Sequence, residues 1–403
     1  MIGAWRLIAA PLLLAGAALA AAPLSPREQA EDFDAMWCAL DAGYAYFDSR
    51  HASWKRAREA WRPRAARAAT RADFVAALEG ALEQLRDDSV SLSERSALAR
   101  RVPYESDVWA SWQKGRAVVE SVRTFSDADV AGLRPGHVVA RVNGVPVARA
   151  VRERLGPAPA DAAALDWGLR QVLAGPRRGT QRLEVRDGRE TATLAIERTA
   201  LTRGNGPAVI ARRMGDERGT GYLRVRVGSG DPGVADQLVG ALDHVKDTRA
   251  LIVDLRESLG PGSRAETAAI LDRFGAAQHA APVVILVDRW TAGEGEALAG
   301  ALKAALLARI VGTPTAGMRG ELREATLPRS GIVLTFPEKK TFLAGGAARE
   351  SLLPDVPVDL AAPLGGPGDP ILYRALKLLE PCPGSACRSA PGSPPPARGS
   401  LRR

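Results

Sequence analysis

Residues 208–362 alternate between short apolar runs and helical patterns, and this alternation constrains the fold more than any other feature of the sequence. The runs Ala250–Leu255 and Pro282–Val287 are almost continuously apolar, which is typical of strands buried on both faces of a parallel sheet. Further strands are expected at 221–227 and 308–312, and helices at 234–245, 264–274 and from residue 288 to 307. The pattern predicts an α/β domain with a largely parallel sheet.

Ligands bind to such sheets in the crevice outside the carboxyl ends of the strands. The loops at 256–263, 288–296 and 312–320 follow strands or lead out of them, so we expect them to converge at this crevice. The sequence therefore places its candidate functional residues in these three loops.

The chain before residue 208 has a different character. Residues 23–100 show helical spacing of apolar residues, and Thr70 with Asp73 is a helix-start pattern. Residues 103–200 contain short β-like runs separated by Gly and Pro. We expect an N-terminal helical region (23–100), a small β-rich domain (103–200), an α/β domain (208–380) and a disordered Pro- and Ser-rich tail (381–403).

The first twenty residues form a signal-peptide pattern. Arg6 precedes the apolar stretch Leu7–Ala20, and Ala18-Leu19-Ala20 is a small-x-small cleavage pattern. The apolar stretch is short for a membrane span, although an uncleaved anchor is the alternative. These features predict an exported, periplasmic protein without an integral span after cleavage.

Charge and cysteine usage restrict the partners. The net charge of +9 comes from Arg residues scattered through the chain, not from the clustered basic stripe that nucleic acid binding requires. Cys382 and Cys387 could form a small disulfide in an oxidising compartment, whereas Cys38 is expected to be a buried free thiol. Three Cys residues without a nearby His pattern are a poor metal site. We expect neither a metal nor a cofactor, and the oligomeric state stays open.

One segment of the β-rich part resembles a PDZ domain. Ala131-Gly-Leu-Arg-Pro-Gly136 followed by Val138-Val-Ala-Arg-Val-Asn-Gly144 is similar to the turn, strand and Asn-Gly of that family, with His137 where the family often has Asp. The resemblance implies binding of a peptide as an added strand with capture of its C-terminal carboxylate. The peptide-binding candidates are Gly132, Leu133, Gly136 and Val138. The alternative is a β-rich spacer that binds nothing.

The α/β part resembles the tail-specific (S41, C-terminal processing) serine peptidases, whose catalytic domain has a crotonase-like core of the ClpP/crotonase type. The matching stretches are Leu251–Arg256, Val283–Val287 with Trp290-Thr291, Val311–Gly317 and Leu353–Val358. With the helical and PDZ-like parts, the resemblance extends over nearly the whole chain after the signal pattern. It implies peptide or protein C-termini as substrates or partners.

The residues that this resemblance assigns to catalysis are replaced. The nucleophile position falls on Gly293, which has no side chain and cannot attack a carbonyl. The Lys base falls on Met318 or Arg319, neither of which can accept a proton. The His base of tricorn-type relatives falls on Ser89. The expected oxyanion loop contains Gly260 and Gly262, and Pro261 between them has no N–H.

Three functional hypotheses follow. The first is a catalytically inactive S41 homologue that binds peptide ends or a protein partner. The second is an active serine-type endopeptidase with a relocated nucleophile, for which Ser258, Ser263 and Ser330 are the candidates. The third is a hydrolase or lyase on a crotonase-like core driven by Glu294 or Glu296, although acidic residues at a helix start also interact favourably with the helix dipole.

Overall fold

The computed structural model describes most of the chain between residues 24 and 380. The described ranges are 24–47, 51–96, 100–156, 160–198, 206–215, 219–228, 231–259, 263–277, 281–317, 320–340, 351–362 and 368–380. The signal pattern, the C-terminal tail and the pair Cys382 and Cys387 lie outside these ranges, so the predictions made for them stay predictions.

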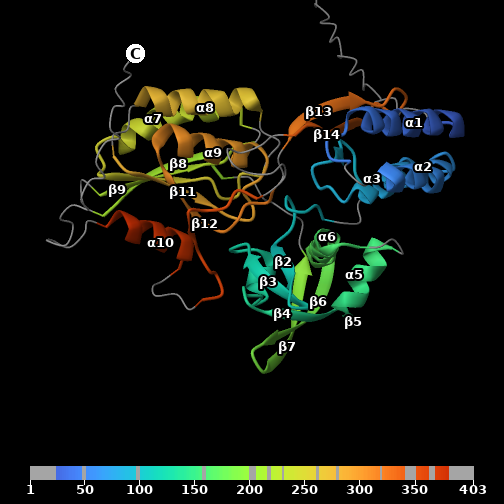
Figure 1. The fold of residues 1–403 in the computed structure, drawn as a ribbon, viewed down its shortest axis with the longest axis horizontal. Coiled ribbons are helices and arrows are strands. Elements are labelled where there is room, and N and C mark those ends of the chain that lie inside the picture. Colours follow the sequence, from blue (N-terminus) through green and yellow to red (C-terminus); the bar gives the residue numbers. More distant parts are fainter. Residues whose placement is uncertain are drawn as a thin grey trace, which may run out of the picture.

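Helices and strands alternate along the chain much as the sequence pattern predicts (Figure 1). The helices are α1 (Pro26–Gly43), α2 (His51–Ala65), α3 (Arg71–Leu82), the 3₁₀ turn η2 (Glu83–Leu85), α4 (Asp127–Val130), α5 (Val147–Leu155), α6 (Ala162–Ala174), α7 (Val234–Val245), α8 (Arg264–Ala277), α9 (Glu294–Leu306) and α10 (Pro370–Leu379). The strands are β1 (Ser91–Leu92), β2 (Val108–Gln113), β3 (Arg116–Val122), β4 (Val138–Val142), β5 (Val145–Pro146), β6 (Gly179–Asp187), β7 (Glu190–Arg198), β8 (Val209–Met214), β9 (Thr220–Val225), β10 (Ala250–Asp254), β11 (Val283–Val287), β12 (Arg309–Gly312), β13 (Glu321–Thr326), β14 (Val333–Lys339) and β15 (Val356–Pro357).

The α/β domain is built on a six-stranded sheet in the order β15-β12-β11-β10-β9-β8. All neighbouring pairs are parallel except β8 with β9. The central strands β10 and β11 are buried at every position, as their continuous apolar runs predict. Helices α7, α8 and α9 cover one face of this sheet and α10 covers the other (Figure 1). The predicted α/β core with a parallel sheet is thus confirmed.

The β-rich domain is a sheet in the order β2-β3-β4-β6-β7, with the short β5 paired to β4. Helices α5 and α6 pack on it, and the apolar faces of both helices join one hydrophobic core. Its strands are antiparallel and joined by tight turns, such as Lys114-Gly115 between β2 and β3, where both residues have positive φ.

The helical region consists of α1, α2 and α3, and α3 begins at the predicted site. Thr70 caps the helix through its side chain and Asp73 returns the hydrogen bond, which forms a capping box. A hairpin from far along the chain, β13–β14, joins this region because β14 pairs with β1. Phe336 and Leu334 of the hairpin are fully buried in the same core as Phe33 of α1.

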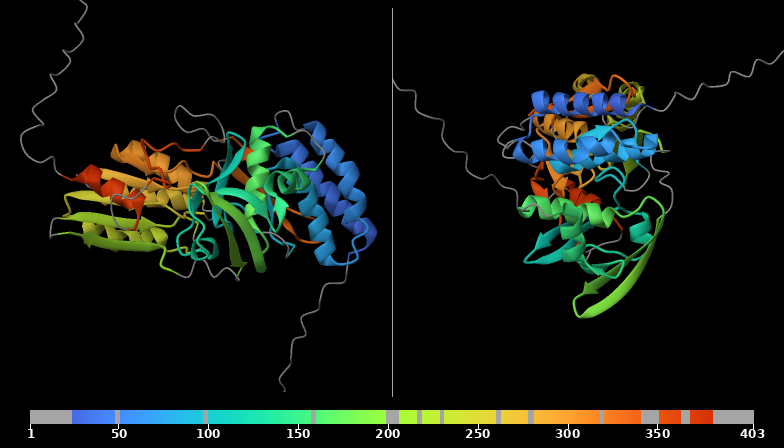
Figure 2. Two further views of the ribbon diagram at one scale, coloured as in Figure 1. Left: turned by 90° about the horizontal axis from the view of Figure 1, so that it is seen from below. Right: turned by 90° about the vertical axis from the view of Figure 1, so that its right-hand side faces the viewer.

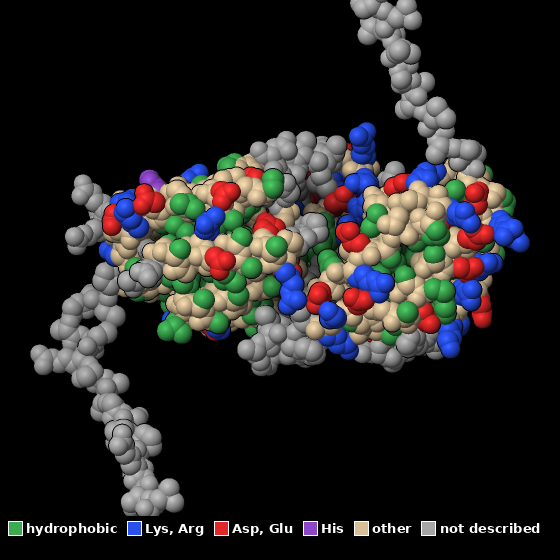
Figure 3. All heavy atoms as spheres, turned by 90° about the horizontal axis from the view of Figure 1, so that it is seen from above, with side chains coloured by type: hydrophobic (Ala, Val, Ile, Leu, Met, Phe, Trp, Pro, Cys, Tyr) green, Lys and Arg blue, Asp and Glu red, His purple; other side chains and the backbone are tan. Residues whose placement is uncertain are grey.

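The helical region and the α/β domain lie side by side, with the β-rich domain packed below both (Figures 1 and 2). Lys and Arg side chains are interspersed with Asp and Glu side chains on the face drawn in Figure 3. Within the described part of the chain, none of the helices combines the length and apolar character that crossing a membrane requires.

The expected burial of Cys38 is wrong. Cys38 is exposed because α1 turns Phe33, Met36 and Leu40 towards the core, and residue 38 points away from that face. A lone Cys in a helical pattern carries no signal about which face it occupies.

Candidate functional site

The turn between β11 and α9, residues 288–293, stands at the carboxyl end of the central strand. Gly293 is the N-cap residue of α9 and has φ 54° and ψ −119°. A residue with a side chain is strained at such a positive φ, and turns of this strand-to-helix type display a reactive side chain in hydrolases. Gly293 therefore lies at a strand-to-helix turn, as the sequence predicts, and it has no side chain that could react.

Glu296 is fully buried on the first turn of α9, and its carboxylate is surrounded by internal donors. It accepts hydrogen bonds from the N–H of Gly293 (3.1 Å), the N–H of Gly317 (2.9 Å) and the hydroxyl of Thr315. These bonds tie the start of α9 to the loop that follows β12. Glu294 accepts a hydrogen bond from the Thr267 hydroxyl of α8 at 2.7 Å. Both carboxylates thus have structural partners.

The three candidate serines also have local structural roles. The Ser258 hydroxyl is fully buried; it donates to Val225 O at 3.2 Å and accepts from Val227 N–H at 3.3 Å. The Ser263 hydroxyl accepts from Glu266 N–H at 3.0 Å near the start of α8. Ser330 lies in the β13–β14 turn, where its hydroxyl accepts from Ile332 N–H at 3.2 Å. No hydrogen bond of a described residue joins any of these hydroxyls to a His, Lys or carboxylate.

Ser89 follows η2, on the side of the helical region that faces α6 of the β-rich domain. Its N–H donates to the Asp87 carboxylate at 2.9 Å, and its buried hydroxyl has no hydrogen-bond partner among the described residues. Asp87 also accepts from the Tyr44 hydroxyl. The remaining family positions, Gly260, Pro261, Gly262, Met318 and Arg319, lie outside the described residues.

Two acidic residues occupy equivalent places at the ends of β10 and β11. Asp254 is buried, and burial would raise its pKa, but the Arg256 guanidinium at 2.7 Å keeps it below the ordinary value. Asp288 has no such close cation. Burial raises the pKa of Asp288 to about 6, and the neighbouring charge of Glu257 adds to the effect. Sequence reasoning did not single out Asp288, although a carboxylate directly after a buried strand is the signal that could have done so.

Trp290 joins this turn to the β-rich domain. Its indole N–H donates to Ser106 O at 3.0 Å, and its ring lies under the Arg123 guanidinium at 5.0 Å. Arg289 pairs with Glu120 of β3 at 2.6 Å. The turn at residues 288–293 is therefore held between two domains.

The residues predicted to bind peptide form a turn and part of a core. Gly132 and Gly136 have positive φ, and Leu133 is fully buried. Val138 lies in β4, which is paired with β3 on one side and β6 on the other. An added strand would therefore need another edge, and the role of these four residues in binding stays a prediction.

The edge strand β2 is covered by α6. The Trp112 N–H donates to the Asp166 carboxylate at 2.7 Å, and the Trp112 indole N–H donates to Leu165 O at 3.2 Å. One of the two edge strands of this sheet thus already makes hydrogen bonds within the chain at Trp112.

Two family models match separate parts of the chain. Residues 264–358 match peptidase family S41, and residues 25–82 match the tricorn protease C1 domain. The chain is a homologue of peptidase family S41. None of the curated proteins compared with the chain matches it.

Solved structures share the fold of this S41 homologue at low sequence identity. The photosystem II D1 C-terminal processing protease is 19% identical, with a TM-score of 0.51 over 83% of this chain and 94% of that one. Mature CPAF is 16% identical, with a TM-score of 0.53 over 83% and 93%. The s499a mutant of CPAF is 15% identical, with a TM-score of 0.54 over 88% and 96%. At these identities the likeness concerns the fold.

The match to peptidase family S41 is a match to a family of serine-type peptidases, which are hydrolases that act by proteolysis. The described part of the crevice offers a different set of groups. The strand-to-helix turn and the start of α9 hold a glycine, a buried Glu296 that accepts hydrogen bonds from internal donors, and Asp288, whose pKa is raised by burial to about 6. Among the described residues, no group of three or more His, Cys, Asp and Glu side chains could hold a metal ion.

Proposed function

We propose that this chain is a catalytically inactive S41 homologue that binds peptide ends or a protein partner after export to the periplasm. Gly293 carries the proposal, because it occupies the strand-to-helix turn where the family resemblance places a serine. A residue without a side chain cannot form an acyl intermediate.

The expected loss of catalytic rate argues against peptide turnover. In a serine triad, loss of the nucleophile or the base lowers kcat by roughly 10⁶-fold. With an intact oxyanion hole and substrate binding, the remaining rate is about 10³–10⁴-fold above that of the reaction in water. Rates of that order are too slow for a peptidase, whereas a binding site does not depend on them.

The two catalytic alternatives have weaker support. Ser258 and Ser263 hydrogen-bond to backbone atoms of their own surroundings, and neither contacts a base among the described residues. A carboxylate-driven reaction would need an accessible acid, but Glu296 is fully buried with three internal donors. Binding without turnover is the simplest function for this set of residues.

Two assays on the purified chain, started after the signal pattern, test the proposal. A fluorophosphonate should leave every serine unlabelled, and an unstructured casein-type substrate should stay intact from pH 5 to pH 9. Chymotrypsin in the same buffers is the positive control for both reagents. A label that maps to Ser258, Ser263 or Ser330, with cleavage that disappears in that Ser→Ala variant, would establish the relocated nucleophile instead.

The binding half of the proposal needs its own measurement. A random library of N-acetylated peptides with free C-termini is equilibrated with the protein, and bound peptides are recovered and identified by mass spectrometry. We expect enrichment of intact peptides. Recovery of fragments alone would indicate hydrolysis, and no enrichment would contradict a peptide-binding function.

A further inference from the structure

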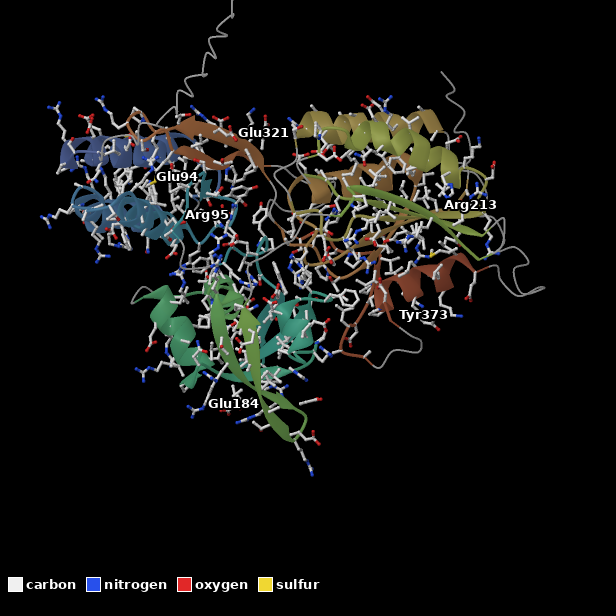
Figure 4. All side chains as sticks on the ribbon, turned by 180° about the vertical axis from the view of Figure 1, so that it is seen from behind. Glu94, Arg95, Glu184, Arg213, Glu321 and Tyr373 are labelled. Atoms are coloured by element: carbon white, nitrogen blue, oxygen red, sulfur yellow. The ribbon has the colours of Figure 1, made fainter. Side chains whose placement is uncertain are left out.

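A cavity of about 490 Å³ lies between the helical region and the β-rich domain. Its walls come from α2, α3, η2 and residues 87–96 and 100–101 on one side and from α5 and α6 on the other, and they include Trp61, Glu79, Asp88, Arg95, Arg101 and Trp167. Arg95 projects between these two parts of the molecule in Figure 4. Sites for small ligands have volumes of about 300–1,000 Å³, so this interdomain cavity can hold a few residues of a peptide.

The charged side chains that line the interdomain cavity are paired, with one exception. Glu83 binds Arg154 through two contacts of 2.6 and 2.7 Å. Arg95 pairs with Glu105, and Arg100 with Asp107. Glu79 accepts from Ser96 N–H, and Asp88 accepts from Gln171 Nε2 at 2.8 Å and from Trp167 Nε1 at 3.3 Å. Asp87 is bonded to Tyr44 and Ser89.

Arg101 is the exception. Its guanidinium makes no hydrogen bond or ion pair with any residue that the structure describes, and its carbon Cζ lies 4.4 Å from the centroid of the Tyr104 ring. Stacking on a ring holds a guanidinium in place while its N–H donors point outward in its plane. A half-buried cation held in this way is preorganised for a carboxylate, which accepts two parallel hydrogen bonds from it.

The surroundings favour an anion that carries an apolar group. Burial raises the pKa of Asp88 to about 6 and also raises the pKa of Glu79, so both acids oppose an incoming anion less as the pH falls. Trp61, Leu82 and Val90 add apolar or aromatic surface to the wall. Burial raises the pKa of the Tyr104 phenol; the charge of Arg101 lowers it, and the charges of Asp88 and Glu296 raise it further.

We propose that the interdomain cavity binds the C-terminal carboxylate of a peptide, with Arg101 as the anion-binding residue. The inference rests on the proposed peptide-binding function and names the site for it. This site is separate from the edge of β2, where the Trp112 N–H is already bonded to Asp166. It is also separate from the turn at residues 131–138.

The test uses isothermal titration calorimetry with N-acetyl-Ala-Phe-Ala as the free acid and as its C-terminal amide. We expect the acid to bind at pH 6.5 and the amide to bind at least about tenfold more weakly, because a charge-assisted bidentate pair is lost. Arg101→Gln should weaken binding of the acid by a similar factor, and Arg101→Lys should weaken it less. Arg116→Gln, an exposed charge on β3, is the matched control and should leave binding unchanged.

The possible outcomes separate the two proposals. If the acid binds equally well to wild type and Arg101→Gln, with both variants melting as wild type does, the chain binds peptides but not through Arg101. Equal binding of acid and amide also overturns the inference and leaves peptide binding intact. If neither form binds to the wild type, the proposed site is wrong, and the peptide-library experiment decides separately whether the chain binds peptides.

Discussion

At the scale of single residues, the β11–α9 turn combines a positive φ with a residue that has no side chain. Gly293 keeps a positive φ at the end of a buried strand, yet offers nothing to react. The nearby Asp288 lies among other acids and carries a carboxyl group whose pKa is raised mainly by burial. This residue therefore destabilises the folded state when it ionises.

The substitution Asp288→Asn tests the free-energy cost of ionising this carboxyl group in the folded state. The pKa is 3.8 ordinarily and about 6 in the folded protein, so the folded state binds the proton more tightly and stability falls as the pH rises through this interval. The variant should gain up to about 3 kcal/mol over wild type between pH 4 and pH 7. The hydrogen bonds from Glu257 N–H, Trp290 N–H and the Thr291 hydroxyl all go to Asp288 Oδ1, which Asn keeps.

Urea unfolding at pH 4.5 and pH 7 measures this gain. Asp243→Asn on the exposed face of α7 is the control, because Lys246 lowers the pKa of that carboxyl and the pH dependence should be small and of opposite sign. A stability difference between Asp288→Asn and wild type that does not change with pH would show that ionisation of Asp288 has no cost.

Gly295 is required by close packing. A Cβ at this position would lie 2.7 Å from Ser258 Cβ and 2.9 Å from Ser258 O. Gly295→Ala should therefore destabilise the protein by about 1–3 kcal/mol through overpacking. Gly240→Ala in α7, where nothing lies within 4 Å of the added atom, should instead stabilise it by about 0.5–1 kcal/mol. Thermal unfolding of both variants checks the contrast, and equal effects would contradict it.

At the scale of elements, helix starts are set by local hydrogen bonds. Helices α1 and α3 begin with a capping box, formed by Ser25 with Glu28 and by Thr70 with Asp73. At the start of α9 the N-cap residue Gly293 has no side chain, and only the Glu296 carboxylate makes a side-chain hydrogen bond, to the Gly293 N–H. The same carboxylate also holds Gly317, which couples the helix start to the next loop of the crevice.

Thr70→Ala should cost about 1 kcal/mol, because the N–H of Asp73 loses its acceptor at the start of α3. Thr70→Ser keeps the hydroxyl and should restore most of this stability. Guanidinium unfolding followed by circular dichroism measures both variants. If alanine and serine have the same midpoint, the hydroxyl does not stabilise α3.

At the scale of the whole molecule, the β13–β14 hairpin connects parts of the chain that are far apart in sequence. It leaves the α/β domain and buries Phe336, Leu334 and Ile332 in the core of the helical region. Trp290 and Arg289 make a second connection, to the β-rich domain. The interdomain cavity lies where the helical region and β-rich domain meet.

Phe336→Ala should destabilise the protein by about 3–5 kcal/mol, because it leaves a cavity between the hairpin and the helical region. Leu322→Ala on the same hairpin is 43% exposed and should change stability by less than about 0.5 kcal/mol. Calorimetry should show one shifted transition for Phe336→Ala. A separate early transition, with the rest of the protein melting as in wild type, would mean that the hairpin does not couple the two parts.

The sequence pattern alone determined the central elements of the α/β domain, but not β8, β15 or α10. Continuous apolar runs predict β10 and β11 because a strand buried on both faces is made mostly of apolar residues, and the start of α3 follows from Thr70 and Asp73. The Gly at position 293 is likewise visible in the sequence, and its place after a buried strand is a local property. These features depend on residues that are close together along the chain.

Only the tertiary structure decided which distant residues meet. The pairing of β1 with β14, the outward face of Cys38, the raised pKa of Asp288 and the unpaired Arg101 each depend on segments separated by tens or hundreds of residues. No periodicity records such contacts, because burial and charge pairing depend on the packing of whole elements against one another. The sequence therefore predicts that the nucleophile position falls on a glycine, whereas the packing of two domains created the cavity for which we propose peptide binding.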